Sequence, residues 1–529
     1  MENRITAVEW RWVLVASLIV IGLSSVPYVL GLLIETPELR YSGFVIGIQD
    51  MHSYLGKMRW GAAHPGFRFE LFYTAEPHTG GFVFGPQLFL GKVMGLLSGQ
   101  GGAVSGRLLW MVYHVWRVAA ALLMLFAIYA FAARFVEAVP VRRLAWGIAA
   151  VTGGLDWVLV LAGFTPLAFL VPEAFSFLIV FLLPHLAMAR ALMLVGWLLL
   201  LRAVDHSSWQ LAALAGLVWV IMGVFVPFFD ALLGVLIATW LFGQLIVKRR
   251  IPWKPFGLAA IAGALPVVLL LYNAWLFTTD PVFAVWQAQN DLPSPPVFQY
   301  LLAYGLLIAL AVPGVRRLLQ DGLTDDAILL LTWPLAAAAM VYLPVNVQRR
   351  LVEGAIVPLA VLSAMGIVEI VRGHRRQLRR AAVAVALFLL VMPNFFLIFG
   401  AVQTVSRRAW PVFVPAEVLQ AADWIDANVP PYSVFVAEEL QSNMLAGYTR
   451  VKVFHGHGPE TLYLDEKREQ AQAFFSGEGG IEVLREGGVD YVFWGPQERA
   501  FCEGLDCLAG LPLEPVYADE TVTIYEVLP

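Results

Sequence analysis

Acids, bases and histidines gather between residues 47 and 91, a segment that follows one long apolar run and precedes many others. Ionisable groups placed close to lipid are energetically costly and usually mark function. The segment therefore predicts a functional site at a membrane surface. In chain order its ionisable residues include Asp50, His52, Lys57, Arg59, His64, Glu70, Glu76 and His78.

Asp50 is the first candidate for catalysis because it directly follows the apolar run 44–48. A carboxylate in this position can act as a general base that takes a proton from an attacking hydroxyl. Partial burial would tune its pKa to that task. If residues 49–60 are helical, Tyr54 shares a face with Asp50. We expect His52, Tyr54 and His78 to contact substrate.

Glu76 and His78 add a second acid and an imidazole to the same loop. Together with Asp50 they could hold a divalent cation, since carboxylate and imidazole are ordinary metal ligands. Their spacing is not diagnostic of a metal site, so the need for a metal ion stays open. The alternative for His78 is a loop histidine that is hydrogen-bonded to the backbone. Glu76 is a second candidate for catalysis, whatever the role of His78.

Arg349 and Arg350 are adjacent guanidiniums at the start of an apolar run. Arginine grips phosphate through paired hydrogen bonds, so this pair is a candidate for binding a phosphate. The alternative is that both side chains extend to lipid headgroups.

The segment 453–461 is a glycine-rich loop with two histidines and an acid, and it lacks a phosphate-loop pattern. His457 in this loop is a candidate for contacting substrate or metal, with a plain turn as the alternative. The two cysteines of the chain, Cys502 and Cys507, lie further on and could form a local disulfide in an oxidising space.

The composition places the chain among membrane proteins. Of its 529 residues, 59% are hydrophobic and 14% are charged, whereas soluble domains carry about 25% charged residues. A net charge of -4 gives no reason to expect nucleic acid as a partner. A bilayer span needs about 20 residues, and about eleven segments are long enough. They are 12–34, 107–133, 144–163, 174–201, 209–227, 229–247, 256–277, 297–315, 327–343, 351–371 and 381–402.

Lysine and arginine are distributed unevenly between the two ends of these spans. If the N-terminus is cytoplasmic, the lysine and arginine residues of the short loops collect on the inner side, and the short outer loops beyond the first hold only Arg349 and Arg350. This topology makes residues 35–106 the first outer loop and puts the tail outside the membrane. The first apolar run is too long for a signal peptide, so we expect a retained helix.

The tail from residue 411 to residue 529 differs in composition from the 1–410 transmembrane domain. Segments 415–428 and 481–486 have helical spacing, whereas 432–437 and 489–494 are typical of short buried strands. Segments 516–517 and 522–527 predict a final β-hairpin pair. A small α/β domain of about 115 residues, within the usual range of domain sizes, is therefore expected outside the membrane.

The chain resembles the GT-C superfamily of integral-membrane glycosyltransferases, nearest to bacterial protein-mannosyltransferase, arabinosyltransferase and galacturonosyltransferase-like proteins. The resemblance lies in one span before a large outer loop with an early acid, about eleven spans and an α/β tail. Five short motifs carry it. They are Gln49-Asp-Met-His-Ser-Tyr54, Glu76-Pro-His-Thr-Gly80, Gln348-Arg-Arg350 with Pro358-Leu-Ala360, Gly456-His-Gly-Pro-Glu-Thr461 and Tyr491-Val-Phe-Trp-Gly-Pro-Gln-Glu-Arg499.

The resemblance implies a plasma-membrane enzyme that transfers a hexose or pentose from a polyprenyl-phosphate donor to a glycan, lipid or protein. The lipid phosphate would meet Arg349, Arg350 and Lys57, and Asp50 would accept the acceptor's proton with inversion at the anomeric carbon. The outer domain, including His457, would help to bind the acceptor. The family commonly has a pair of acids in the first loop, whereas Met51 and His52 follow Asp50 here.

Two other classes of function are open. A transporter or flippase would place ionisable groups at mid-membrane on repeated, broken helices, but no repeat is visible and most acids fall at outer helix ends. A non-catalytic component of envelope polysaccharide assembly would keep the fold without turnover, and the missing second acid is compatible with it. Binding of a lipid-phosphate sugar without transfer would favour this last class.

Overall fold

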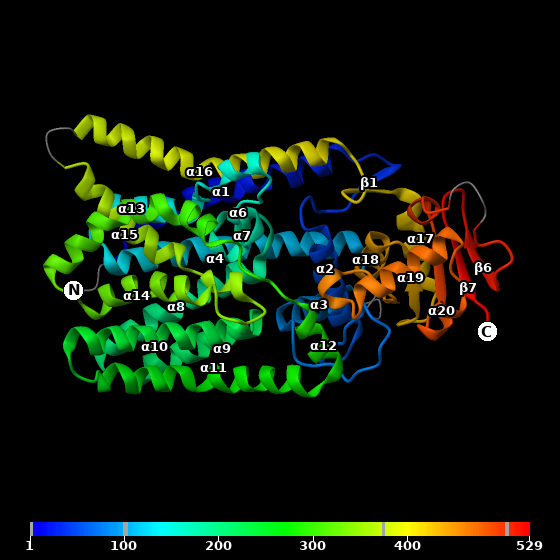
Figure 1. Cartoon of the computed structure of the whole chain (residues 1–529), viewed down its shortest axis with the longest axis horizontal. Coiled ribbons are helices and arrows are strands. Elements are labelled where there is room, and N and C mark those ends of the chain that lie inside the picture. The colour runs from blue at the N-terminus through cyan, green and yellow to red at the C-terminus, as the bar shows by residue number, and fades with distance from the viewer. Residues whose placement is uncertain (1–3, 99–103, 373–375, 503–506) are drawn as a thin grey trace. The chain divides into compact units, whose positions relative to one another are not determined.

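The computed structural model describes residues 4–98, 104–372, 376–502 and 507–529 (Figure 1). The chain forms two compact units, each assembled from three separate segments. The helical unit comprises Met1–Val26, Val115–Ala274 and Asp291–Gly400. The α/β unit comprises Pro27–His114, Trp275–Asn290 and Ala401–Pro529. The first loop and the tail therefore contribute to the same unit, and the domain boundary at residue 411 stays a prediction.

Most of the chain folds into long apolar helices, as the hydropathy pattern predicts. Within the described residues, nine helices are long and apolar enough to cross a membrane. The other two predicted spans, 209–227 and 327–343, are the shorter helices α9 (Trp209–Phe225) and α14 (Asp325–Met340). The nine are α1 (Ala7–Ile34), α4 (Gly106–Phe135), α5 continued by η1 (Val139–Ala162), α8 (Pro184–His206), α10 (Phe228–Lys248), α11 (Trp253–Thr279), α13 (Val297–Asp321), η3 continued by α15 (Gln348–Ile370) and α16 (Arg376–Ser406).

Helices α13 and α15 (Ile356–Ile370) of the helical unit pack side by side (Figure 1). Glycines make the close approach possible, since a Cβ atom at Gly366 would lie 1.9 Å from the backbone oxygen of Leu310. We therefore expect Gly366→Ala to destabilise the unit by about 1–3 kcal/mol, the usual effect of overpacking. Thermal unfolding in detergent measures this.

Gly305 of α13 provides the matched control, because a Cβ atom there would meet nothing within 4 Å. Gly305→Ala should leave the melting temperature unchanged or raise it slightly, since alanine is the better helix former. Equal melting of Gly366→Ala and wild type would show that the two helices do not approach as closely as described.

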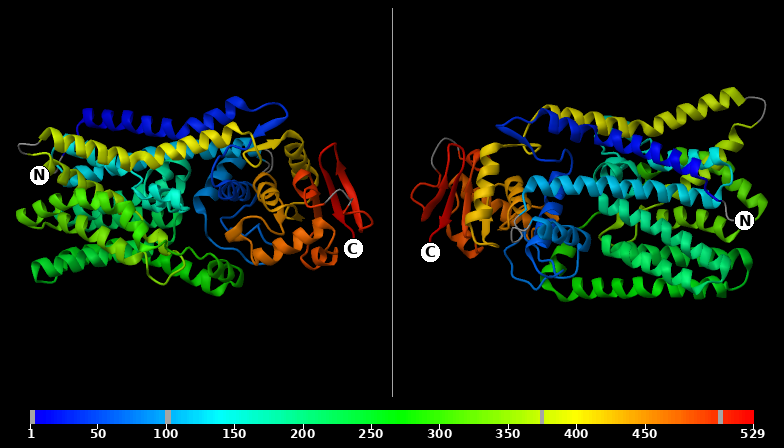
Figure 2. Two further views of the ribbon diagram at one scale, coloured as in Figure 1. Left: turned by 45° about the horizontal axis from the view of Figure 1, so that its top comes forward. Right: turned by 180° about the vertical axis from the view of Figure 1, so that it is seen from behind.

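The tail folds around a five-stranded sheet with the order β4-β3-β5-β7-β6. Strand β3 (Val434–Val436) pairs in parallel with β4 (Lys452–Val453) and β5 (Tyr491–Trp494). Strand β7 (Thr523–Val527) is antiparallel to β5 and to β6 (Leu513–Ala518). Strands β6 and β7 are drawn in red in Figure 2. The strands predicted near 432–437 and 489–494 and the final hairpin pair are thus confirmed.

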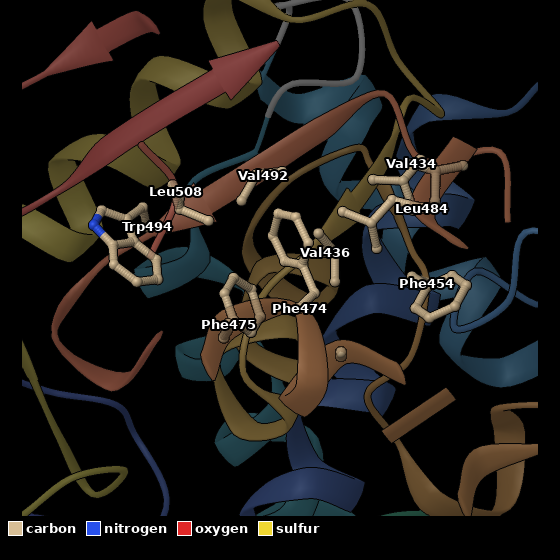
Figure 3. Packing of buried hydrophobic residues seen from close by; sticks show 11 residues of the cluster. Val434, Val436, Phe454, Phe474, Phe475, Leu484, Val492, Trp494 and Leu508 are labelled. Atoms are coloured by element: carbon tan, nitrogen blue, oxygen red, sulfur yellow. The ribbon is translucent and has the colours of Figure 1, made fainter. Parts of the chain in front are cut away.

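Helices cover this sheet and enclose an apolar core. Phe474 and Phe475 of α19 (Leu464–Ser476) pack with Val436 and Val492 of the sheet (Figure 3). Helices α17 (Ala416–Asn428) and α20 (Glu482–Glu486) match the two predicted helical segments. Cys502 and Cys507 form a disulfide.

The first loop is built into the α/β unit rather than lying free. Strand β1 (Leu39–Tyr41) pairs antiparallel with β2 (Phe413–Pro415) of the tail. Helix α2 (Ile48–Ala63) then packs between α3 (Gly85–Ser98) and α18 (Glu439–Tyr448). Glycine again permits contact between backbones, since a Cβ atom at Gly447 would lie 2.9 Å from the oxygen of His52. This packing sets the N-terminal end of α2 against the loop that follows β4.

Candidate active site

Asp50 lies in the first turn of α2, where the helix dipole favours a negative charge. The helix begins after Gly47, whose φ of 60° suits glycine. The imidazole Nε2 of His457 donates a hydrogen bond to Asp50 Oδ1 at 2.9 Å. The Asp50 side chain is 57% exposed, whereas that of His457 is 6% exposed. An accessible carboxylate is therefore held by a buried imidazole.

A buried ion pair lies behind His457. Lys57 Nζ and Ser53 Oγ both donate to Glu460 Oε1, at 2.6 and 2.8 Å, and Lys57 also bonds Ser53. Burial acts to raise the pKa of Glu460, but Lys57, His457 and the hydrogen bond from Ser53 outweigh it and hold that pKa below its usual value. Since His457 Nδ1 lies 3.4 Å from Glu460 Oε1, two acids flank the imidazole.

The loop that carries His457 and Glu460 follows β4, so it leaves the carboxyl end of a parallel strand, where ligands commonly bind in α/β sheets. Gln289 at the end of α12 (Pro281–Gln289) fastens this loop. Its amide Nε2 donates to the backbone oxygens of Pro459 and Thr461, at 3.2 and 2.6 Å. The loop is therefore held from outside the tail.

His52 occupies a second polar cluster on α2. Its Nδ1 donates to Asn443 Oδ1 at 3.1 Å, and the Asn443 amide donates to Tyr73 Oη at 3.2 Å and to the backbone oxygen of Gln49 at 3.1 Å. His52 is buried, with 1% of its surface exposed. Its position fixes α2 against α18, so His52 supports the helix that presents Asp50.

Burial lowers the pKa of His52 to about 4, although the bond to Asn443 opposes this shift. An unfolded histidine has a pKa of about 6.5, so the folded state binds fewer protons between these values. Stability should therefore rise with pH from about 4 to 6.5 and be lost as the pH falls. We expect His52→Asn, which keeps a donor near the Nδ1 position, to flatten this fall in thermal unfolding.

The exposed His206 serves as the control, and His206→Asn should keep the wild-type slope. Some slope should remain in His52→Asn, because burial also lowers the pKa of His455 to about 4. An unchanged slope in His52→Asn would contradict the assignment.

The other candidates of the first loop have separate partners. Glu76 accepts hydrogen bonds from Lys467 Nζ at 2.7 and 2.9 Å and from Thr74. Burial acts to raise the pKa of Glu76, but the bonds from Lys467 and Thr74 outweigh it and lower that pKa. His78 accepts from the backbone N–H of Leu71 at 2.8 Å and donates to the Glu76 backbone oxygen at 3.0 Å. This is the backbone-bonded arrangement considered as the alternative for His78.

The metal candidates do not form a ligand set. Asp50, Glu76 and His78 each bond a different group, and no three His, Cys, Asp or Glu side chains in the described ranges could hold a metal ion.

Tyr54 is half-buried, with its ring stacked on Tyr113 at 6.2 Å and centred 5.1 Å from Lys57 Nζ.

The predicted phosphate ligands Arg349 and Arg350 belong to the helical unit, in the short helix η3 (Gln348–Val352). Arg350 Nε donates to the buried Glu173 at 2.5 Å. Arg349 forms no ion pair with any residue that the structure describes, which leaves its guanidinium charge for a ligand. Nearby in sequence, Glu353 binds Arg190 through both oxygens, at 2.5 and 2.8 Å.

Glu460 is the acid of the predicted glycine-rich loop 453–461 but had no individual role assigned from the sequence, and Ser53 and Gln289 were not predicted as parts of a site. For Glu460 a signal existed, because it follows His457 by three residues and such residues lie on the same side of a tight helical turn. Ser53 and Gln289 are ordinary polar residues without a local pattern, so only the folded chain identifies them.

The chain has the same overall fold as the solved structures of ArnT and of the oligosaccharyltransferase AglB, in a multi-pass helical membrane protein with a small sheet region. One solved structure with this fold is ArnT from Cupriavidus metallidurans bound to undecaprenyl phosphate. Its TM-score is 0.51 at 14% identity, over 99% of this chain and 99% of that chain. The fold class predicted from the sequence is therefore confirmed.

The archaeal oligosaccharyltransferase AglB from Archaeoglobus fulgidus, in complex with an inhibitory peptide and a dolichol-phosphate, also matches. Its TM-score is 0.50 at 13% identity, over 99% of this chain and 75% of that chain. A complex of the oligosaccharyltransferase from the same organism with Zn and sulfate has a TM-score of 0.52 at 13% identity, over 97% and 73% of the two chains. No protein-family model and no curated protein matches the sequence.

Proposed function

We propose that this protein is a membrane glycosyltransferase that moves a sugar from a polyprenyl-phosphate donor to a hydroxyl group of a glycan, lipid or protein. One observation carries the proposal: the accessible carboxylate of Asp50 is oriented by His457, which is itself flanked by Glu460. The fold supports it, because ArnT is bound to undecaprenyl phosphate and AglB to a dolichol-phosphate in their structures.

In the proposed reaction the acceptor hydroxyl attacks the anomeric carbon of the donor sugar. Asp50 takes the hydroxyl proton as the new carbon–oxygen bond forms. The bond from the anomeric carbon to the phosphate oxygen breaks, and polyprenyl phosphate leaves with the electron pair. Attack from the opposite side inverts the anomeric centre. His457 positions the carboxylate, and Glu460 and Lys57 hold His457 and its loop in place.

Arg349 is proposed to bind the donor phosphate, since it forms no ion pair with a described residue, although the Glu173 carboxylate that pairs with Arg350 also attracts its charge. We expect Arg349→Gln to raise the KM for the donor about 10- to 100-fold, as loss of a charged hydrogen bond implies. The same change at Arg317, an exposed residue paired with Asp321, should leave KM unchanged. Equal KM values for Arg349→Gln and wild type would remove Arg349 from donor binding.

The α/β unit is proposed to face the extracytoplasmic side, with a tail domain at 411–529. The Cys502–Cys507 disulfide supports this orientation, because disulfides persist in oxidising compartments. A membrane-impermeant thiol reagent should label an introduced Tyr463→Cys, an exposed site of this unit, in intact cells. Labelling only after lysis would show that the α/β unit faces the cytoplasm and would contradict the proposed orientation.

The proposed function is tested by incubating the purified protein with radiolabelled polyprenyl-phosphate sugars and membrane acceptors. Transfer accompanied by release of polyprenyl phosphate supports it. Saturable binding of a donor without release, in the presence of acceptor-containing membranes, would instead favour a non-catalytic component of polysaccharide assembly.

A further inference from the structure

The α/β unit contains an open cavity of about 300 Å³ that the proposed reaction does not use. Its walls come from the end of α1 and β1, the start of α4, α17 and the end of α18. Ligand pockets in proteins begin at about this size. The residues that matter for its chemistry are Glu35, Arg40, Arg107, Trp110 and Asp423.

The cavity lies at the level where two membrane spans end. Helix α1 ends at Ile34, immediately before Glu35, and α4 begins at Gly106, immediately before Arg107. Both helices are long and apolar enough to cross a membrane. The ends of such spans meet the headgroup layer, where tryptophan and tyrosine are enriched. The cavity is therefore bordered by the ends of two candidate membrane helices, the kind of position at which headgroups are met.

Both signs of charge line the cavity. Arg107 Nη2 lies 3.0 Å and Arg40 Nη1 lies 3.9 Å from Glu35 Oε1. Asp423 adds a second carboxylate, and burial raises its pKa while Arg59 opposes the shift. A ligand with only negative charge would meet two carboxylates, and one with only positive charge would meet two guanidiniums. A ligand with both charges matches the lining.

Aromatic rings complete the lining. Trp110 is buried in the wall, with the guanidinium carbon of Arg107 6.0 Å from its ring centre. The Tyr41 ring meets Trp110 edge to face at 6.3 Å. Ring faces attract ammonium groups, and carboxylates accept hydrogen bonds from a primary ammonium.

We propose that this cavity binds the headgroup of a zwitterionic phospholipid of the phosphoethanolamine class. Arg40 and Arg107 bind the phosphate, and Arg107 exchanges its bond to Glu35 for it. Asp423, Glu35 and the face of Trp110 receive the ammonium group. The site would anchor the α/β unit to the membrane surface independently of glycosyl transfer.

The test measures binding of dioleoyl phosphatidylethanolamine to the full-length protein by native mass spectrometry. Dioleoyl phosphatidylglycerol and dioleoyl phosphatidylcholine are compared at matched concentrations. We expect the phosphatidylethanolamine lipid to bind about 10-fold more tightly than either, because loss of one charged hydrogen bond is worth this factor. Soluble O-phosphoethanolamine should compete, whereas inorganic phosphate should not.

Two variants test the binding of the phosphate and of the ammonium group separately. Arg40→Gln should weaken all three lipids, whereas Asp423→Asn should remove only the preference for phosphatidylethanolamine. Arg407→Gln is the matched control, because Arg407 is exposed just beyond the end of α16 and does not line the cavity. Melting temperatures establish that each variant is folded.

Equal binding of phosphatidylglycerol and phosphatidylethanolamine to the wild-type protein would overturn the proposal. An effect of Arg407→Gln as large as that of Arg40→Gln would do the same, since it would indicate general attraction of surface charges. None of these measurements uses sugar transfer, so their outcome does not depend on the proposed function.

Discussion

Replacing Asp50 with asparagine is expected to lower the rate of sugar transfer about 10²- to 10⁴-fold, the range that a general base contributes. Asparagine keeps the shape of the side chain and can still accept a hydrogen bond from His457, but it cannot take a proton from the acceptor. Because Asp50 is exposed, folding and donor binding should be little affected. The rate constant is measured with saturating donor, together with the melting temperature.

The variant Glu76→Gln shows whether the loss of transfer is specific to Asp50. Glu76 is the other acid considered for catalysis, and it is held by Lys467 and Thr74. We expect transfer by this variant to stay within about 10-fold of wild type, since it removes no proton acceptor from the reaction. If Asp50→Asn retained full activity and Glu76→Gln lost it, the base would be Glu76.

The second large effect concerns stability and centres on Lys57, whose side chain is 1% exposed. Lys57→Met removes the lysine partner of the buried Glu460 and leaves that carboxylate with only the hydrogen bond from Ser53 and the nearby imidazole of His457. Breaking a buried ion pair in this way usually costs about 3–5 kcal/mol. Chemical or thermal unfolding in detergent, followed at the α/β unit through a fluorescent label, measures the loss.

The double variant Lys57→Met with Glu460→Leu tests the cause. Replacing both members of a buried pair with apolar residues is often neutral, so the double variant should be much more stable than Lys57→Met alone. Arg317→Met, which breaks an exposed pair with Asp321, should change stability by less than about 1 kcal/mol. A double variant as unstable as the single one would show that packing, and not the unpaired charge, dominates.

The sequence predicts those parts of the fold that local patterns determine. Long apolar runs identify the membrane helices, although the predicted span 174–201 is divided at Leu183 into α7 (Phe177–Leu182) and α8, which begins at Pro184. Short runs of valine and aromatic residues identify β3 and β5, because β-branched and aromatic residues are enriched in buried strands. Helices α9 and α14 are shorter than the predicted segments, since hydropathy fades gradually while a helix ends at a definite residue.

The site is predicted only in part because its partners are distant in sequence. Asp50 and His457 are 407 residues apart, and Glu76 and Lys467 are 391 residues apart. No local pattern records such pairings. Asp50 and His457 could be chosen individually by residue type and context, but their hydrogen bond and the role of Glu460 required the folded chain.

The three-segment origin of the α/β unit has a consequence for biosynthesis. Residues 457–460 emerge from the ribosome after every apolar span of the described chain has been made. Until then Lys57 has no Glu460 to pair with, and Asp50 has no His457. A nascent chain released before this point would carry Lys57 among the rings of Tyr54, Phe69 and Phe84 without its acidic partner. Synthesis of residues 457–460 is therefore the step that allows the site to assemble.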